Sequence, residues 1–86
     1  MSNIEYSRLL DLYGPLLTAK QREYLDCYYN DDLSLSEIAE NFGVTPQGAH
    51  DIVSRARKKL VDTENKLGFM ARFGDLETKT EETHGV

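Results

Sequence analysis

The chain has 86 residues, 40% of them hydrophobic, and carries 10 Lys or Arg against 15 Asp or Glu, for a net charge of −5. This length and composition fit one small globular domain. They exclude a membrane-spanning segment and a disulfide framework, because no apolar run reaches roughly 20 residues and Cys27 is the only cysteine. The start MSNIEYSR also lacks the layout of a signal peptide, so we expect a cytoplasmic protein with no membrane insertion.

Two helices are predicted before residue 33. The apolar residues of the first recur at helical spacing, at Leu9, Leu12, Tyr13 and Leu16. Pro15 should end or kink this helix, because proline removes a backbone donor and disfavours helical geometry at the residue before it. Thr18 and Gln21 form a capping box that opens the second helix. Its apolar face comprises Tyr24, Leu25, Tyr28 and Tyr29, and the poor helix formers at residues 30–32 should end it.

The next two helices have the pattern of a helix-turn-helix. Ser34 and Glu37 form a second capping box, and Gly43 should end the short helix that follows in the left-handed conformation. Thr45 can cap the next helix, with Pro46 in its first turn. The residues expected to point inward are Ile38, Ala39, Phe42, Val44, Ala49 and Ile52. Two short helices joined by a tight glycine-containing turn form this motif, which we place at about residues 35–55.

The last predicted helix runs on toward Leu67, where Gly68 weakens it. A short apolar element should follow, with Phe69, Met70, Phe73 and Leu76. From Glu77 the sequence is polar, and we predict a disordered tail at residues 77–86. The expected fold is therefore all-α, a helix-turn-helix domain at residues 1–76 with an extended C-terminal helix. We also expect a homodimer, because several residues offer more apolar surface than a short chain covers alone: Leu60, Leu67, Met70 and Phe73.

Positive charge gathers in one segment directly after the motif. Residues 46–60 carry a net charge of +3, whereas residues 1–45 carry −5 and residues 61–86 carry −3. The basic residues are Arg55, Arg57, Lys58 and Lys59. Arg55, Lys58 and Lys59 can share a helix face, because they are three and four residues apart, with Arg57 to the side. Such a face can be an ordinary solvated surface, or it can contact phosphates.

The candidate nucleic-acid-binding residues follow from the geometry of the motif. In DNA readers of this kind, the early residues of the second helix face base edges. Gln47 and His50 can hydrogen-bond bases, whereas Asp51 would repel phosphates. The full candidate set is Thr45, Gln47, His50, Asp51, Ser54, Arg55, Arg57, Lys58 and Lys59.

Other kinds of site find no support in the sequence. His50 and His84 lie far apart with no second ligand at useful spacing, so we expect no metal site. Cys27 has no nearby base or cation, and the tyrosines at positions 24, 28 and 29 have the spacing of core residues rather than of a base-stacking platform. We find no phosphate loop and no catalytic residues, and we expect no cofactor and no enzymatic activity.

The segment LLTAKQREYLDCYYNDDLSLSEIAENFGVTPQGAHDIVSRARKKL resembles region four of bacterial sigma factors. It resembles more closely the YlxM-like family, small bacterial helix-turn-helix proteins associated with the signal recognition particle pathway. The pieces that carry this resemblance are LLTAKQ, YYNDDLSLSEIAENFGV and HD followed by Arg55, within residues 16–60. Pro46 departs from the pattern, since the family usually has an arginine there, and this removes a phosphate contact.

The resemblance implies a regulatory or accessory role near the signal recognition particle, with its RNA, its protein component or its receptor as partner. It places the recognition face at Thr45, Gln47, His50, Asp51, Ser54 and Arg55. Two other functions stay open on the sequence. One is a DNA-binding transcription regulator that uses the same helix, and the other is a protein-interaction module in which the basic residues meet an acidic partner.

Overall fold

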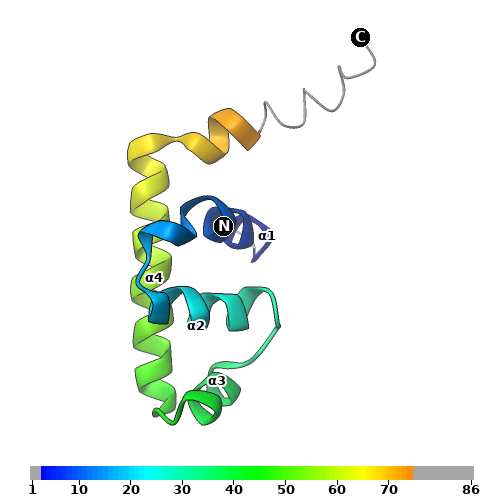
Figure 1. Cartoon of the computed structure of the whole chain (residues 1–86), viewed down its shortest axis with the longest axis vertical. Helices are drawn as coiled ribbons and strands as arrows, with labels where there is room; N and C mark the ends of the chain where they lie inside the picture. Colours follow the sequence, from blue (N-terminus) through cyan, green and yellow to red (C-terminus); the bar gives the residue numbers. More distant parts are fainter. Residues whose placement is uncertain (1–2, 75–86) are drawn as a thin grey trace.

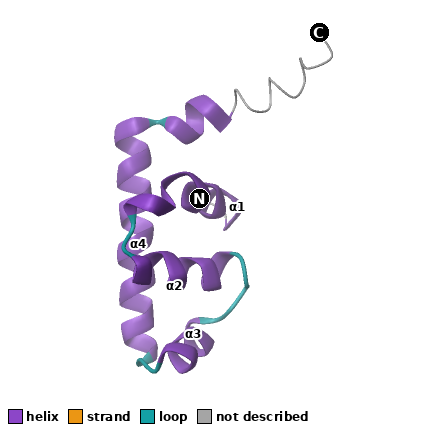
Figure 2. Ribbon diagram, in the orientation of Figure 1, coloured by secondary structure: helices purple, strands orange, loops and turns teal. Residues whose placement is uncertain are grey.

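The computed structural model describes residues 3–74, and the regular elements within this range are all helical (Figures 1 and 2). The elements are α1 (Asn3–Tyr13), the 3₁₀ turn η1 (Gly14–Leu16), α2 (Ala19–Tyr29), α3 (Leu35–Phe42), α4 (Pro46–Leu67) and the π-helical turn η2 (Met70–Gly74). The all-α prediction is confirmed. Leu76 and the predicted tail at residues 77–86 lie outside the described residues. None of the described helices is both long and apolar enough to cross a membrane.

The long helix α4 supports the whole arrangement. It has 22 residues and is therefore about 33 Å long at 1.5 Å per residue. The three earlier helices pack against it in sequence, α1 toward its C-terminal half, α2 near its middle and α3 at its start (Figure 1). α2 also contacts both α1 and α3. The start of α4 is therefore held by the two helices that precede it.

One stripe of α4 provides its share of the core. Its buried residues are Ala49, Val53, Ala56 and Leu60, spaced four, three and four apart. This spacing places them on one face of the helix. The alanines are small, so neighbouring helices can approach closely. The other buried apolar residues are Leu9, Leu10, Tyr13, Leu17, Tyr24, Leu25, Tyr29, Ile38 and Ala39.

The expected apolar faces are wrong at Leu12 and Leu16, and Phe42 lies only at the edge of the core. Leu12 and Leu16 are 41% and 53% exposed, because α1 packs through Leu9, Leu10 and Tyr13 and the turn η1 directs Leu17 inward instead. Phe42 lies at the edge, 36% exposed, where its ring stacks on Tyr24 at 4.5 Å between centroids. Tyr28, Val44 and Ile52 are half-buried against the core.

The residues proposed for a homodimer also need correction. Leu60 is fully buried inside the chain, so it cannot form a surface for self-association. Met70 is half-buried against the core, and Leu67 is 41% exposed. The side chain of Phe73 lies outside what the structure describes. Self-association remains a prediction, without Leu60.

The helix starts follow their predicted capping signals. Thr18 Oγ1 accepts the Gln21 backbone N–H at 3.1 Å, and the Gln21 side chain accepts the Thr18 N–H in return. Ser34 and Glu37 form the same reciprocal pair, at 3.1 and 3.0 Å. Each box satisfies two backbone donors that the helix start would otherwise leave without partners.

The turn between α3 and α4 is the predicted one. Gly43 has φ +66° and ψ +34°, which is the left-handed conformation. The Val44 N–H donates to the Ala39 carbonyl at 2.9 Å, and the Gly43 N–H donates to the Glu40 carbonyl at 3.4 Å. These bonds satisfy two of the last four carbonyls of α3. The helix-turn-helix is therefore closed by local bonds as well as by packing.

The far end of α4 is fixed by one carboxylate. Glu64 Oε1 accepts the Tyr13 hydroxyl at 2.7 Å and the Met70 N–H at 2.9 Å, and Oε2 accepts the Ala71 N–H at 3.1 Å. The Phe69 N–H donates to the Tyr13 hydroxyl oxygen at 3.2 Å. Glu64 thus joins α1, α4 and the start of η2, just before Gly68 ends α4.

Candidate nucleic-acid interface

Most of the predicted recognition residues lie on the outer side of the first half of α4, whereas Ser54 is half-buried. Thr45 Oγ1 accepts the Gly48 N–H at 3.0 Å and so caps the helix, with Pro46 as its first residue. Gln47, His50 and Asp51 are exposed to solvent. The structure therefore places these side chains where a ligand can reach them.

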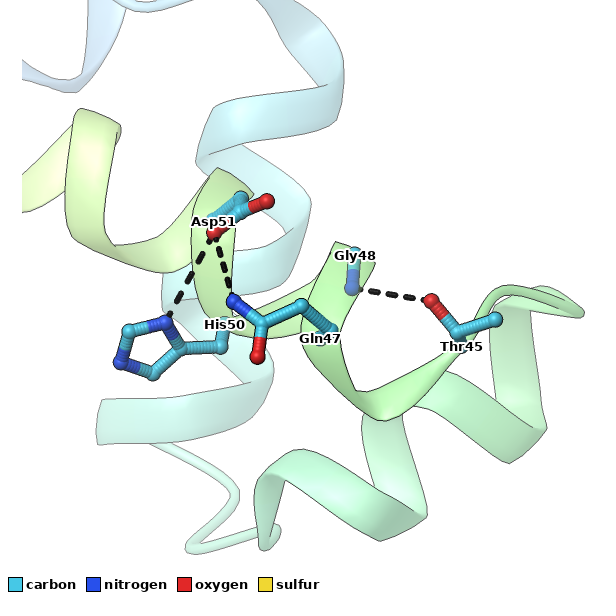
Figure 3. A network of polar contacts seen from close by, with 5 residues as sticks. All are labelled: Thr45, Gln47, Gly48, His50 and Asp51. Atoms are coloured by element: carbon cyan, nitrogen blue, oxygen red, sulfur yellow. Dashed lines mark hydrogen bonds and ion pairs between the residues drawn. The ribbon is translucent and has the colours of Figure 1, made fainter.

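Gln47, His50 and Asp51 form one polar network, seen close by in Figure 3. Gln47 Nε2 donates to Asp51 Oδ1 at 3.0 Å, across one turn of the helix. His50 Nδ1 lies 3.8 Å from the same Oδ1, and the two side chains are 57% and 55% exposed. Both partners act on Oδ1, and Asp51 Oδ2 has no hydrogen-bond partner within residues 3–74.

The exposed cations continue this surface along α4. Arg55, Lys58 and Lys59 are exposed, and they form no ion pair with any residue in the described range 3–74. At 3.6 residues per turn, Lys58 falls in line with Asp51, seven residues before it. Arg55 and Lys59, four apart, lie together on one flank of that line. We call Arg55, Lys58 and Lys59 the basic face.

Arg57 occupies a different environment from the basic face. It is half-buried, and its guanidinium carbon lies 4.6 Å from the centroid of the Tyr6 ring. The Tyr6 side chain is the main cause that raises the pKa of Arg57 above its usual value. Tyr6 in turn stacks on Tyr29 at 5.2 Å, and burial raises the pKa of Tyr29 to about 12. Arg57 therefore joins α4 to α1 through a cation–π contact.

The charge pattern of the sequence groups Arg57 with the other three cations and gives no sign of its contact with Tyr6. The two residues are far apart in the chain, so no helical spacing rule connects them. The half-buried position of Arg57 agrees with the prediction that it lies to the side of Arg55, Lys58 and Lys59. Its assignment to nucleic acid remains a prediction, and the structure shows its side chain engaged within the fold.

The other candidates of the sequence fall into structural roles. Tyr24 and Tyr29 are buried, as expected for core residues. Cys27 is half-buried, and burial together with neighbouring carboxylates, chiefly that of Asp31, raises the pKa of its thiol. No group of three or more His, Cys, Asp or Glu side chains in the described part of the chain could hold a metal ion. His84 lies outside that part.

The fold and the exposed start of α4 define a helix-turn-helix protein. Over residues 2–83 the chain matches the family described as helix-turn-helix protein, YlxM / p13 like. The chain belongs to this family. The resemblance to the YlxM-like family is thereby confirmed.

Several curated relatives share about half of their aligned residues with this chain. A UPF0122 protein of Clostridium kluyveri is 50% identical over 74 residues, which cover 86% of this chain and 67% of the relative. One of Desulforamulus reducens is 48% identical over 65 residues, 76% of this chain and 56% of the relative. One of Limosilactobacillus reuteri is 48% identical over 71 residues, which cover 83% of this chain and 63% of the relative. The chain thus spans between 56% and 67% of the length of these relatives.

Proposed function

We propose that this protein binds nucleic acid through α4 and acts as a non-enzymatic regulatory or accessory protein of the signal recognition particle pathway. The observation that supports binding most directly is the basic face. Its cations, Arg55, Lys58 and Lys59, are exposed and have no acidic partner within residues 3–74. Cations in this condition are available to phosphates, which supply most of the affinity of proteins for nucleic acid.

The form of the site favours duplex DNA as the direct ligand. An α-helix with its side chains is about 10–12 Å wide, and the major groove of B-form DNA is about 12 Å wide. The major groove of an RNA duplex is deep and narrow, and side chains cannot read it. The exposed first half of α4 therefore fits a DNA groove better than an RNA duplex. This geometry favours a DNA-binding transcription regulator as the second candidate function.

The pathway is suggested by the family resemblance and not by the geometry. In that setting the candidate partners are the particle's RNA, its protein component and the receptor GTPase. Each would be met in the cytoplasm. If the partner is a protein, the basic face would contact an acidic surface, and nucleic acid would compete poorly for it.

The test is a set of titrations of the full chain at several salt concentrations. The ligands are random duplex DNA, signal recognition particle RNA, and the particle's protein component with its receptor. Binding to nucleic acid should weaken with salt, because each phosphate contact releases condensed counterions. Replacing Arg55 and Lys59 with alanine together should flatten the log–log salt slope by roughly 1.4 to 1.8, the value for two contacts.

A matched control removes the same charge away from the basic face. Arg8 and Lys66 are exposed cations on α1 and near the end of α4. Their double alanine variant should retain the wild-type slope. Equal slopes for wild type and the Arg55/Lys59 variant would remove the basic face from the mechanism. Saturable binding to the protein component alone, with none to DNA or RNA, would contradict nucleic-acid binding.

A further inference from the structure

We infer that the start of α4 selects a cytosine in the major groove of duplex DNA, with Asp51 as the residue that determines this specificity. The inference rests on the proposed function, because α4 must enter a groove for Asp51 to reach a base. It goes beyond that function by naming the base and the atom that recognises it.

The first step is the orientation of the Asp51 carboxylate. Gln47 donates to Oδ1 at 3.0 Å, and His50 Nδ1 lies 3.8 Å from the same atom. Figure 3 shows both partners on one side of the carboxylate and its second oxygen turned away from them. An unsupported carboxylate on an exposed helix would rotate among several rotamers. Here the hydrogen bond from Gln47 favours one orientation of the carboxylate, in which Oδ2 points away from Gln47 and His50.

The second step is the chemistry of the base edges. A carboxylate oxygen can only accept hydrogen bonds, so it needs a donor on the base. In the major groove cytosine presents only the donor N4 amino group. Guanine presents the acceptors N7 and O6, and thymine presents the acceptor O4, so each would repel Oδ2. Adenine has a donor at N6, but its acceptor N7 lies beside it. Asp51 therefore prefers cytosine, followed by adenine.

The third step is the cost of a carboxylate on this surface. Asp51 lies in line with Lys58, and the other two residues of the basic face, Arg55 and Lys59, lie to one side of that line. A negative charge there opposes every phosphate backbone, whatever the sequence. This repulsion is offset only where a base amino group donates a hydrogen bond to Oδ2. Asp51 thus lowers affinity for most sequences and spares those with the matching base, which is how specificity is obtained by repulsion.

The experiment selects binding sites for the full chain from a random library of duplex DNA. The bound pool should be enriched in cytosine at one position. A duplex carrying that site should lose about fivefold or more in affinity when the C·G pair is replaced by T·A or G·C. Asp51→Ala should bind random duplex DNA more tightly than wild type does and should show no preference at that position. Asp51→Asn should shift the preference to adenine, which an amide contacts through N6 and N7.

The matched control is Asp62→Ala, which removes one exposed carboxylate of α4 outside the network. It should retain the cytosine preference. Gln47→Ala should weaken the cytosine preference without abolishing it, since Gln47 orients the carboxylate of Asp51. All variants change exposed side chains, and melting temperatures should confirm that they fold.

The outcomes separate this inference from the proposed function. No binding of wild type to any nucleic acid would overturn both. Binding to single-stranded RNA but not to duplex DNA would overturn the inference alone. Duplex binding with the same base preference in wild type and Asp51→Ala would also overturn the inference and leave the proposed function standing.

Discussion

The two ends of α4 use a carboxylate in opposite ways. At the start of the helix, Asp51 is exposed and has one oxygen without a partner in residues 3–74. Near the end, both oxygens of Glu64 accept hydrogen bonds, from the Tyr13 hydroxyl and from backbone N–H groups of η2. A carboxylate whose acceptor positions are filled within the chain stabilises the fold. A carboxylate with an unfilled acceptor position is available to a ligand. Glu64 therefore has a structural role, whereas Asp51 is a candidate for binding.

The largest expected loss of stability comes from removing a buried apolar side chain close to Glu64. Leu60 is one turn before Glu64 and fully buried. Leu60→Ala should lower the free energy of unfolding by about 2–5 kcal/mol, because it leaves a cavity in the core. Leu67→Ala, at a residue 41% exposed, is the control and should cost much less. Denaturant unfolding measures both, and equal losses would show that Leu60 is not a core residue.

The next largest loss of stability concerns the turn at Gly43, which leads into the end of α4 that carries Asp51. Gly43 has φ +66°, and a Cβ atom there would meet no other atom within 4 Å. Any loss therefore comes from backbone strain and not from a clash. Gly43→Val should destabilise the protein by about 1–3 kcal/mol, because a β-branched residue tolerates this conformation badly. Gly43→Asn should cost less. An unchanged melting temperature for the valine variant would contradict the turn.

A direct test compares the two carboxylates. Glu64→Gln replaces one accepting oxygen with an NH2 group, which cannot accept a hydrogen bond from the neighbouring donors. It should lower the free energy of unfolding by about 1–2 kcal/mol. Asp51→Asn changes an exposed side chain and should alter stability by less than about 0.5 kcal/mol. Parallel urea titrations measure both variants. If Asp51→Asn proved as destabilising as Glu64→Gln, the two ends would not differ in the way described.

The pH dependence of stability should also show the stabilising contribution of the Glu64 carboxylate. Burial raises the pKa of this carboxyl, but the hydrogen bonds from Tyr13, Met70 and Ala71 outweigh it and lower the pKa below 4.5. A folded-state pKa below the unfolded value gives stability that is present above about pH 4.5 and lost as the pH falls through the folded pKa. The stability difference between wild type and Glu64→Gln should therefore shrink in acid. A constant difference would contradict this.

The smallest effect concerns two tyrosine hydroxyls. The Tyr13 hydroxyl is used by Glu64 and the Phe69 N–H, whereas the buried Tyr24 hydroxyl has no hydrogen-bond partner in the described structure. Tyr24→Phe should leave stability unchanged or raise it by up to about 1 kcal/mol, because it removes an unsatisfied polar group. Tyr13→Phe should lower stability by about 1 kcal/mol. Thermal melts should therefore show a lower melting temperature for Tyr13→Phe and an unchanged or higher one for Tyr24→Phe.

The sequence was sufficient to predict the helix-turn-helix because its signals are local. The capping pairs Thr18–Gln21 and Ser34–Glu37 lie within one turn, and Gly43 acts on its own backbone. The core was predicted less well. Leu12 and Leu16 have apolar side chains at helical spacing, but whether they are buried depends on where α1 meets α2 and α4. Spacing along one helix cannot decide that.

The same limit of local reasoning applies to the candidate site. The pair Gln47 and Asp51 could be expected to interact, since residues four apart face each other on a helix. The contact of Arg57 with Tyr6 could not, because it joins the last helix of the motif to α1. The partner of Glu64 is likewise 51 residues away, at Tyr13. Which cations remain available to a ligand is thus set by tertiary contacts.

The position of α4 has a consequence for the order of folding. α1, α2 and α3 all pack against this later helix (Figure 1). During synthesis they emerge before it, and their apolar faces cannot be fully covered until residues up to Leu60 have been made. The N-terminal helices therefore cannot complete folding in stages ahead of α4. Residues 3–74 should form their core in one cooperative step, which begins when α4 becomes available.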